Sequence, residues 1–176
     1  MALEADTMNE LVETVARFVR ERLRPLEARV ADDDAIPEWI RQEIADLGLF
    51  GLTIPQEYGG LGLDMEEEVR IALELGRTSP AFRSLVGTNN GIGSLGLILD
   101  GTEEQKARYL PRLATGELIS SFALTEPEAG SDAGSLRTTA RRVGDGYVLN
   151  GTKRFITNAP QAGLFTVFAR TAASRD

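Results

Sequence analysis

Two short stretches of the sequence bring together residue types that could hold a flat polar ligand. In the first, "FALTEPEAGSD", residues that suit a buried strand run from Phe122 to Glu126 and meet Pro127, which removes a backbone donor and ends strand pairing. Gly130 permits a positive φ, and the Ser131 hydroxyl can turn toward free backbone amides. The residues predict a loop of amides and hydroxyls against an apolar wall.

The second stretch, "FIT", supplies an aromatic ring close to a hydroxyl. Phe155 lies two residues before Thr157, and the first stretch contributes the hydroxyl of Thr125. An aromatic wall with two hydroxyls suits a planar heterocycle with hydrogen-bond acceptors along its edges. The alternative is a pair of strand-ending turns whose Ser and Thr side chains bond to nearby backbone, which is common. The residues by themselves leave both interpretations open.

The residue types that are missing restrict the chemistry more than those that are present. The 176 residues include no Cys, which excludes a thiolate nucleophile and a thiolate metal site. They include no His, which excludes a Ser-His-Asp triad and the commonest general base and metal ligand. We expect no metal site, and catalysis would need carboxylates, Lys, Tyr or a bound cofactor.

Composition indicates an acidic globular protein. The net charge of −8, from 27 acidic and 19 basic residues, argues against a nucleic-acid partner, because phosphate binding relies on clustered Lys and Arg. The acidic start "MALEADTMNE" lacks the apolar region of a secretory signal. No apolar run approaches the ~20 residues that span a bilayer. We therefore expect a soluble, cytoplasmic protein.

Residues 1–118 carry helical patterning. Apolar residues recur every three or four positions from Leu11 to Val30, which predicts one long helix that Pro25 kinks or breaks near Leu23. A second helix should start at Pro37 and end at Gly48. The glycine-rich run "TIPQEYGGLGLD" should be a loop.

Two further helices have recognisable starts. Asp64 followed by Glu67 predicts the start of a third helix, and Thr102 with Gln105 forms a capping box for a helix that ends near Ala114. In the third helix we expect five apolar residues to face inward: Met65, Val69, Ala72, Leu73 and Leu75.

From residue 119 the patterning favours strands. "LISSFALT" and "LFTVFAR", the latter at 164–170, read as strands, and Asp145-Gly146 and Asn150-Gly151 are hairpin turn signals. The sequence predicts an α+β fold, with an all-helical N-terminal domain at 1–118 and an antiparallel β segment at 119–176. So few strands would leave an edge unpaired, so we expect an incomplete β domain whose edge needs a partner.

Residues 91–96, "GIGSLG", match the G-x-G-x-x-G dinucleotide fingerprint. That motif requires a strand before it and a helix after it within a βαβ unit. "FRSLVGTNN" is a poor strand, and the capped helix at Thr102 interrupts such a unit. We interpret these glycines as allowing close packing or close approach of a ligand to the backbone.

The motifs together resemble the acyl-CoA dehydrogenase family. "LTEPEAGSD" and "NGTKRFITNA" are similar to its two signature segments, and "IPQEYGGLGLD" and "GTEEQKARYLPRLATGE" look like parts of its helical domain. The resemblance implies a helical N-terminal domain, a middle antiparallel β-barrel and a C-terminal helical domain that hold FAD among them. This chain resembles the first domain and the opening strands of the second, with the C-terminal domain absent.

The resemblance also implies roles for particular residues. Ser131 would touch the acyl-CoA as well as the cofactor, Thr157 would lie near the hydride-accepting N5 of the flavin, and Phe155 stands where the family most often has Trp. The residues implied to bind FAD are Phe122, Ala123, Leu124, Thr125, Gly130, Ser131, Phe155, Ile156 and Thr157.

The implied reaction is α,β-dehydrogenation of an acyl-CoA, as in fatty acid metabolism. Its carboxylate base belongs to the C-terminal domain, so no catalytic residue is assigned here, and Glu126 and Glu128 are expected to cap amides or face water. Implied partners are an acyl-CoA substrate, an electron-transferring flavoprotein and further copies in a homo-oligomer. The alternatives are an acyl-CoA oxidase or flavin oxygenase of the same superfamily, or a non-catalytic scaffold subunit.

Overall fold

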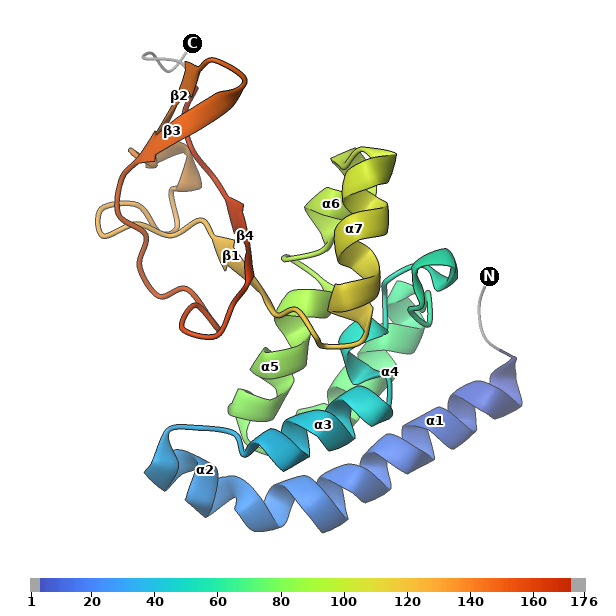
Figure 1. Cartoon of the computed structure of the whole chain (residues 1–176). Helices are drawn as coiled ribbons and strands as arrows, with labels where there is room; N and C mark the ends of the chain where they lie inside the picture. Colours follow the sequence, from blue (N-terminus) through green and yellow to red (C-terminus); the bar gives the residue numbers. More distant parts are fainter. Residues whose placement is uncertain (1–3, 172–176) are drawn as a thin grey trace.

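The computed structural model describes residues 4–171, with helices up to Ala114 and strands from Ser120 (Figure 1). The α-helices are α1 (Ala5–Phe18), α2 (Glu27–Asp33), α3 (Glu38–Asp46), α4 (Met65–Leu75), α5 (Pro80–Asn90), α6 (Leu95–Asp100) and α7 (Glu103–Ala114). The strands are β1 (Ser120–Ala123), β2 (Thr139–Val143), β3 (Gly146–Asn150) and β4 (Leu164–Val167).

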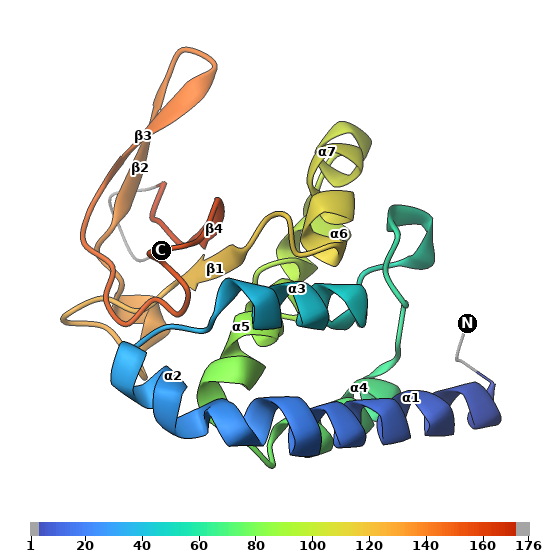
Figure 2. The same cartoon turned by 60° about the horizontal axis from the view of Figure 1, so that its bottom comes forward.

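The first two helices form one bent rod, and the helical winding changes in the segment that leads up to and includes Pro25 (Figure 2). Between α1 and α2 lie a π-helical turn, Val19–Leu23, and a 3-10 turn, Arg24–Leu26. Proline lacks a backbone donor and its ring clashes with the carbonyl four residues earlier, and a change of winding relieves both problems. The predicted disturbance near Leu23 is confirmed, although the chain continues in helical conformation.

The helices enclose a main apolar core and a smaller cluster. α1 packs along α4, and both α3 and α5 contact a 3-10 turn at Leu49–Gly51 that buries Phe50 (Figure 2). The smaller cluster joins α7 to the chain before β1 and consists of Ile54, Leu110, Leu113, Ala114 and Leu118.

Both predicted capping boxes are present. The Asp64 side chain accepts a hydrogen bond from the Glu67 amide at 2.9 Å, and the Glu67 carboxylate accepts one from the Asp64 amide at 2.9 Å. Thr102 and Gln105 make the equivalent pair at the start of α7. Pro37 lies one residue before α3, as its N-cap, rather than in its first turn.

The prediction of the buried face of α4 is confirmed for Leu75 and wrong for Met65, Val69 and Leu73. Met65, Val69 and Leu73 are 80%, 49% and 64% exposed, whereas Ile71 and Leu75 are buried. Apolar residues four apart occupy two opposite faces of this helix, so periodicity alone does not choose between them. The buried face is the one that also carries Glu67, whose carboxylate must reach back to the amide of Asp64.

The β region consists of two separate pairs of strands. β1 and β4 pair in parallel, in a register that joins Ser120 to Leu164, while β2 and β3 form an antiparallel hairpin. The antiparallel prediction is therefore wrong for β1 and β4, and the described strands do not close a barrel. Parallel pairing needs a long crossover, which the chain between β1 and β4 provides.

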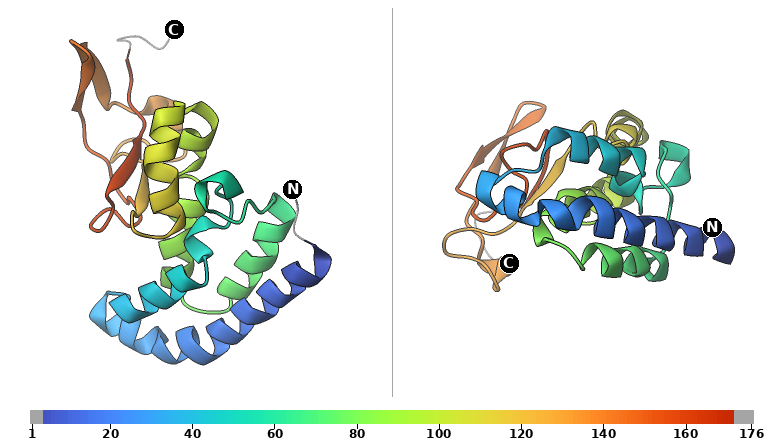
Figure 3. Two further views of the ribbon diagram at one scale, coloured as in Figure 1. Left: turned by 45° about the vertical axis from the view of Figure 1, so that its right-hand side comes forward. Right: turned by 90° about the horizontal axis from the view of Figure 1, so that it is seen from below.

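The hairpin extends away from the helices and is almost wholly exposed (Figures 1 and 3). Its tight turn is Gly144-Asp145, one residue earlier than predicted, because Val143 pairs with Gly146 and Gly144 takes a positive φ of 60°. The second predicted hairpin signal, Asn150-Gly151, does not start another strand, because the chain leaves β3 as a loop.

Gly93 serves packing, one of the two roles that the sequence interpretation proposed for the glycines at 91–96. No strand precedes them, since α5 runs up to Asn90. A Cβ placed on Gly93 would lie 2.5 Å from the backbone oxygen of Thr88, and would also collide with Ser120 at the start of β1. Glycine at this position lets the helical domain and β1 approach closely.

No helix in the part of the chain from residue 4 to residue 171 is long and apolar enough to cross a membrane.

We predict opposite effects for alanine at two glycines of this segment. Gly93→Ala should lower the free energy of unfolding by about 1–3 kcal/mol, because the new methyl group meets backbone at the junction with β1. Gly96→Ala is the control: a Cβ there meets nothing within 4 Å, so removing glycine from α6 should raise stability by about 0.5–1 kcal/mol. Urea unfolding of both variants measures this, and equal stability of Gly93→Ala and the wild type would contradict the packing role.

Candidate functional site

The end of β1 and the stretch after β3 run beside each other in opposite directions. The Ser121 hydroxyl donates to the carbonyl of Thr157 at 2.7 Å. Further along, the amide of Arg154 donates to the carbonyl of Thr125 at 2.9 Å. These two hydrogen bonds bring the two motif-bearing stretches, far apart in sequence, to one part of the molecule.

A buried asparagine joins this region to the helical domain. Asn89 of α5 donates from Nδ2 to the carbonyls of Leu113 and Leu118, both at 2.9 Å. Its Oδ1 accepts from the amide of Ser120 at 2.8 Å and from the Ser120 hydroxyl at 3.1 Å. One fully buried side chain therefore ties α5, the end of α7 and the first residue of β1 together.

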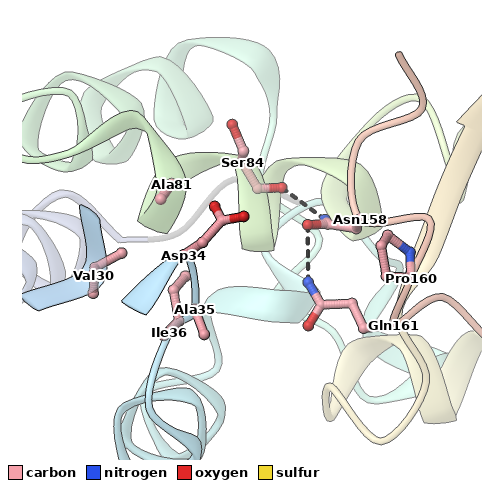
Figure 4. A pocket seen from close by; sticks show the side chains of 9 residues that line it. All are labelled: Val30, Asp34, Ala35, Ile36, Ala81, Ser84, Asn158, Pro160 and Gln161. Carbon is pink, nitrogen blue, oxygen red and sulfur yellow. Dashed lines mark hydrogen bonds between the residues drawn. The ribbon is translucent and has the colours of Figure 1, made fainter. Parts of the chain in front are cut away.

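Asn158 makes a second anchor from the turn that follows Thr157. Its Nδ2 donates to the carbonyl of Ser84 at 3.0 Å, and Gln161 donates to its Oδ1 (Figure 4). The same Nδ2 also donates to the Thr88 hydroxyl at 2.8 Å. A cavity of about 380 Å³ opens beside these residues. It is lined by Val30, Asp34, Ala35, Ile36, Ala81, Ser84, Asn158, Pro160 and Gln161, none of which is a predicted flavin contact (Figure 4).

Glu126 is a buried carboxylate held by hydrogen bonds and by an ion pair. Its carboxylate accepts from the amides of Arg137 and Thr138, at 2.5 and 2.9 Å, and from the Lys153 ammonium at 2.8 Å. Burial alone would raise the pKa of the Glu126 carboxyl, but the hydrogen bonds from Lys153, Thr138 and Arg137 outweigh it and lower the pKa to about 2.

Phe155 is held in an unusual conformation that exposes its ring. Its φ is 56°, and Asn158 on the other side of Thr157 has a φ of 63°. A left-handed conformation at a bulky residue costs of order 1–3 kcal/mol and persists where the surroundings impose it, often at ligand sites. The ring is 79% exposed, with the Arg154 guanidinium 4.4 Å from its centroid.

The remaining predicted residues differ in burial. Phe122 and Ala123 lie on β1, and the Phe122 ring packs edge-on against Phe168 at 5.0 Å between centroids. Leu124 is half-buried and Gly130 is exposed.

The three hydroxyls singled out in the sequence are not engaged by other side chains or backbone groups. Within residues 4–171, no hydrogen bond is made by the hydroxyl of Thr125, Ser131 or Thr157. Thr157 and Ser131 are exposed and Thr125 is half-buried. The structure therefore brings Thr125 and Thr157 to one region, whereas no hydrogen bond among the described residues joins Ser131 to the other stretch.

The described residues offer no general base at this site. Glu126 is unsuitable, because its oxygens are occupied by two amides and an ammonium and its pKa of about 2 makes it a weak proton acceptor. Glu128 is exposed and belongs to the turn after Pro127. The expectation that Glu126 caps amides is confirmed.

The residues that sequence reasoning missed are the ones that hold the site together: Ser121, Lys153, Asn89 and Asn158. Lys153 lies within the quoted segment "NGTKRFITNA", so the sequence singled out its position but not its hydrogen-bond partners. Asn158 lies within the same segment, whereas Asn89 lies outside the segments that carry the resemblance, and the partners of both are mostly backbone groups far along the chain.

The lowered pKa of Glu126 gives a prediction for the pH dependence of stability. A carboxyl whose pKa falls from 4.5 to about 2 on folding contributes stability above pH 4.5, and loses it as the pH falls toward 2. We expect the wild type to be more stable than Glu126→Gln at pH 6, with the difference shrinking between pH 4.5 and 2. Urea midpoints measured across that range provide the check, and a difference that grows toward low pH would contradict it.

Comparison with known proteins places these features in a family. Residues 5–117 match the family model for the acyl-CoA dehydrogenase N-terminal domain, and residues 121–176 match that for the middle domain. The chain is 41% identical over 168 residues to the 3-(aryl)acrylate reductase of Clostridium sporogenes, which covers 95% of this chain and 45% of that protein. It is 42% identical over 169 residues to the human mitochondrial very long-chain specific acyl-CoA dehydrogenase, which covers 93% of this chain and 25% of that protein.

A solved structure shows the same arrangement. Glutaryl-CoA dehydrogenase from Mycobacterium smegmatis, in complex with FADH2, superposes with a TM-score of 0.88 at 36% identity, over 96% of this chain and 43% of that chain. The chain thus spans less than half the length of these relatives. With both of its domains matched, the chain belongs to the acyl-CoA dehydrogenase family.

Proposed function

We propose that this chain takes part in the FAD-dependent α,β-dehydrogenation of an acyl-CoA thioester. The observation that carries the proposal is the pairing of the Thr125 stretch with the stretch that holds Phe155 and Thr157. Two signature segments that lie about thirty residues apart in sequence share one region, and among residues 4–171 no group forms a hydrogen bond with the hydroxyls of Thr125, Ser131 and Thr157.

The chemistry of the donors fits an isoalloxazine ring. The ring is flat and apolar on its faces and has hydrogen-bond acceptors along its edges, so it needs an aromatic or apolar wall and nearby hydroxyls or amides. Phe155 offers an exposed aromatic face, and Thr125 and Thr157 offer free hydroxyls. The left-handed backbone at Phe155 is a conformation expected where a ring has to face a ligand.

Bound FAD supplies an acceptor for the hydride that leaves the β-carbon of the thioester, while a carboxylate base takes the α-proton and the product is the α,β-unsaturated thioester. The chain's contribution is to bind and to orient. With FAD bound, the Thr125 hydroxyl and neighbouring amides would stabilise negative charge on the ring, and the Thr157 hydroxyl would hold the ring near its hydride-accepting nitrogen. Ser131 would contact the cofactor and the acyl-CoA, and Phe155 would cover the apolar surface of the ring.

The remaining partners are part of the same proposal. An electron-transferring flavoprotein would accept the electrons, and the protein would act as a homo-oligomer. The exposed residues of the hairpin, of β4 and of the chain just beyond β4, including Tyr147, Phe165 and Phe168, offer apolar surface for further contacts.

We predict that Phe155→Ala weakens FAD binding about tenfold, because an aromatic contact with a planar ring is worth roughly 0.5–1.5 kcal/mol beyond its buried area. Tyr147→Ala is the control, since Tyr147 is a similarly exposed aromatic residue on β3, away from both motifs. Quenching of flavin fluorescence during titration measures both affinities. Equal affinities of Phe155→Ala and Tyr147→Ala would remove Phe155 from the proposed site.

A second prediction concerns reactivity. The 176-residue chain, refolded with FAD, should become yellow, but anaerobic addition of an acyl-CoA should leave the flavin absorbance unchanged, because no described residue serves as the α-proton acceptor. A chain that stays colourless would end the proposal for this chain. Rapid bleaching by substrate would instead show that a base is present, and Glu128→Gln and Asp132→Asn would test the two exposed carboxylates of the motif.

A further inference from the structure

We propose that Glu126 and Lys153 form a buried latch that fixes the spacing between the two stretches assigned to the flavin, and that they are therefore positioning residues for the cofactor. The consequence for FAD rests on the proposed function. The latch itself is a property of the chain's own contacts and can be tested without any ligand.

Lys153 forms the first half of the latch by bridging the two stretches. Its ammonium donates to the carbonyl of Leu124 at 2.9 Å and to the carboxylate of Glu126 at 2.8 Å. These partners are the residues immediately before and after Thr125, and Lys153 itself lies two residues before Phe155. One ammonium therefore holds the backbone on both sides of Thr125 against the chain that leads into Phe155.

Glu126 forms the second half by joining this pair to the rest of the β region. Its carboxylate accepts from the amides of Arg137 and Thr138, just before β2. The carbonyl of Thr138 accepts from the amide of Arg170, just beyond β4, at 2.8 Å. The backbone of Glu126 also pairs with that of Ala129, which closes the turn of the motif. The latch thus connects the turn, the start of β2 and the chain before Phe155.

The burial of this pair separates it from the other ion pairs of the chain. The Glu126 and Lys153 side chains are 5% and 13% exposed, whereas the Glu103 carboxylate that pairs with Lys106 on α7 is 83% exposed. A buried ion pair is a weak source of stability, because desolvation offsets the attraction, so its retention favours a role in holding one geometry. Glu126 directly follows Thr125, and Lys153 lies two residues before Phe155, so the pair lies beside residues that would touch the ring.

The test compares four variants of the 176-residue chain by urea unfolding, by hydrogen exchange of the apo-protein and by FAD titration. Lys153→Met and Glu126→Gln each remove one partner. The double variant Glu126→Gln/Lys153→Met removes both charges and so leaves no unpaired buried ion. Lys106→Met is the matched control, because it breaks a Lys–Glu pair of similar length, 3.1 Å, on α7, where the Lys side chain is 18% exposed and the Glu side chain 83% exposed.

We expect the amide of Arg154, which bonds to the Thr125 carbonyl, to exchange at least tenfold faster in Lys153→Met and in the double variant. The amide of Ser120, held by Asn89, should be unaffected. FAD affinity should fall at least tenfold in both, and it should stay low in the double variant even where the urea midpoint recovers. Lys106→Met should bind FAD within twofold of the wild type.

Other outcomes overturn the latch. If FAD affinity recovers together with the urea midpoint in the double variant, the pair is a stabilising contact only. If the single variants bind FAD within twofold of the wild type, or exchange at Arg154 is unchanged, the pair does not set the spacing. A wild-type chain that binds no FAD would refute the proposed function instead, and exchange at Arg154 would then decide the latch by itself.

Discussion

A charged carboxylate can stay buried only where hydrogen bonds and a counter-ion replace the water that it loses. Glu126 meets this condition with groups drawn from two separate parts of the chain: the amides of Arg137 and Thr138 before β2, and the ammonium of Lys153. The β region is small and largely exposed, so apolar burial gives it little definition. The hydrogen bonds and the ion pair of this carboxylate therefore help to hold the loops of the β region in one arrangement.

Polar anchors also determine where that arrangement lies on the helical domain. Asn89 satisfies two carbonyls near the end of α7 and the first residue of β1, and Asn158 reaches from the turn after Thr157 to α5. Gly93 adds close backbone contact at the same junction. Asn89 lies on α5, and Asn158 bonds to Ser84 and Thr88 of the same helix. A change in the position of α5 would therefore move both stretches of the site together. In the proposed function, these contacts keep the two FAD-binding stretches in a fixed position relative to the helical domain.

Much of the helical domain was readable because its signals are local. Capping boxes at Asp64 and Thr102 and the proline at position 25 act over a few residues, and the structure contains each of them. The buried face of α4 was not readable, since two apolar faces compete and only tertiary contacts choose between them. The parallel pairing of β1 with β4 likewise depends on a crossover of about forty residues, which leaves no pattern within either strand.

The site shows the same division. The residue types that could meet a planar ring stand out in the sequence, and resemblance to a family gave them roles. Their convergence depends on Lys153, Ser121 and Asn158, whose partners are chiefly backbone groups distant in sequence. Contacts with distant backbone groups leave no regular pattern in the sequence, so they are seen only in the structure. Glu126 illustrates the difference, because its position suggested a cap while its full set of partners required coordinates.

In the proposed function, the Thr125 and Thr157 stretches together form one side of the flavin site. The absence of cysteine from the sequence allows a direct measurement with Thr125→Cys/Thr157→Cys. The rate of intramolecular cross-linking by a bifunctional thiol reagent about 10 Å long, a span of roughly three residues, is measured with and without FAD. We expect rapid cross-linking of the two cysteines in the apo-protein and much slower cross-linking when FAD is bound. Absence of cross-linking, or an equal rate in the presence of FAD, would contradict it.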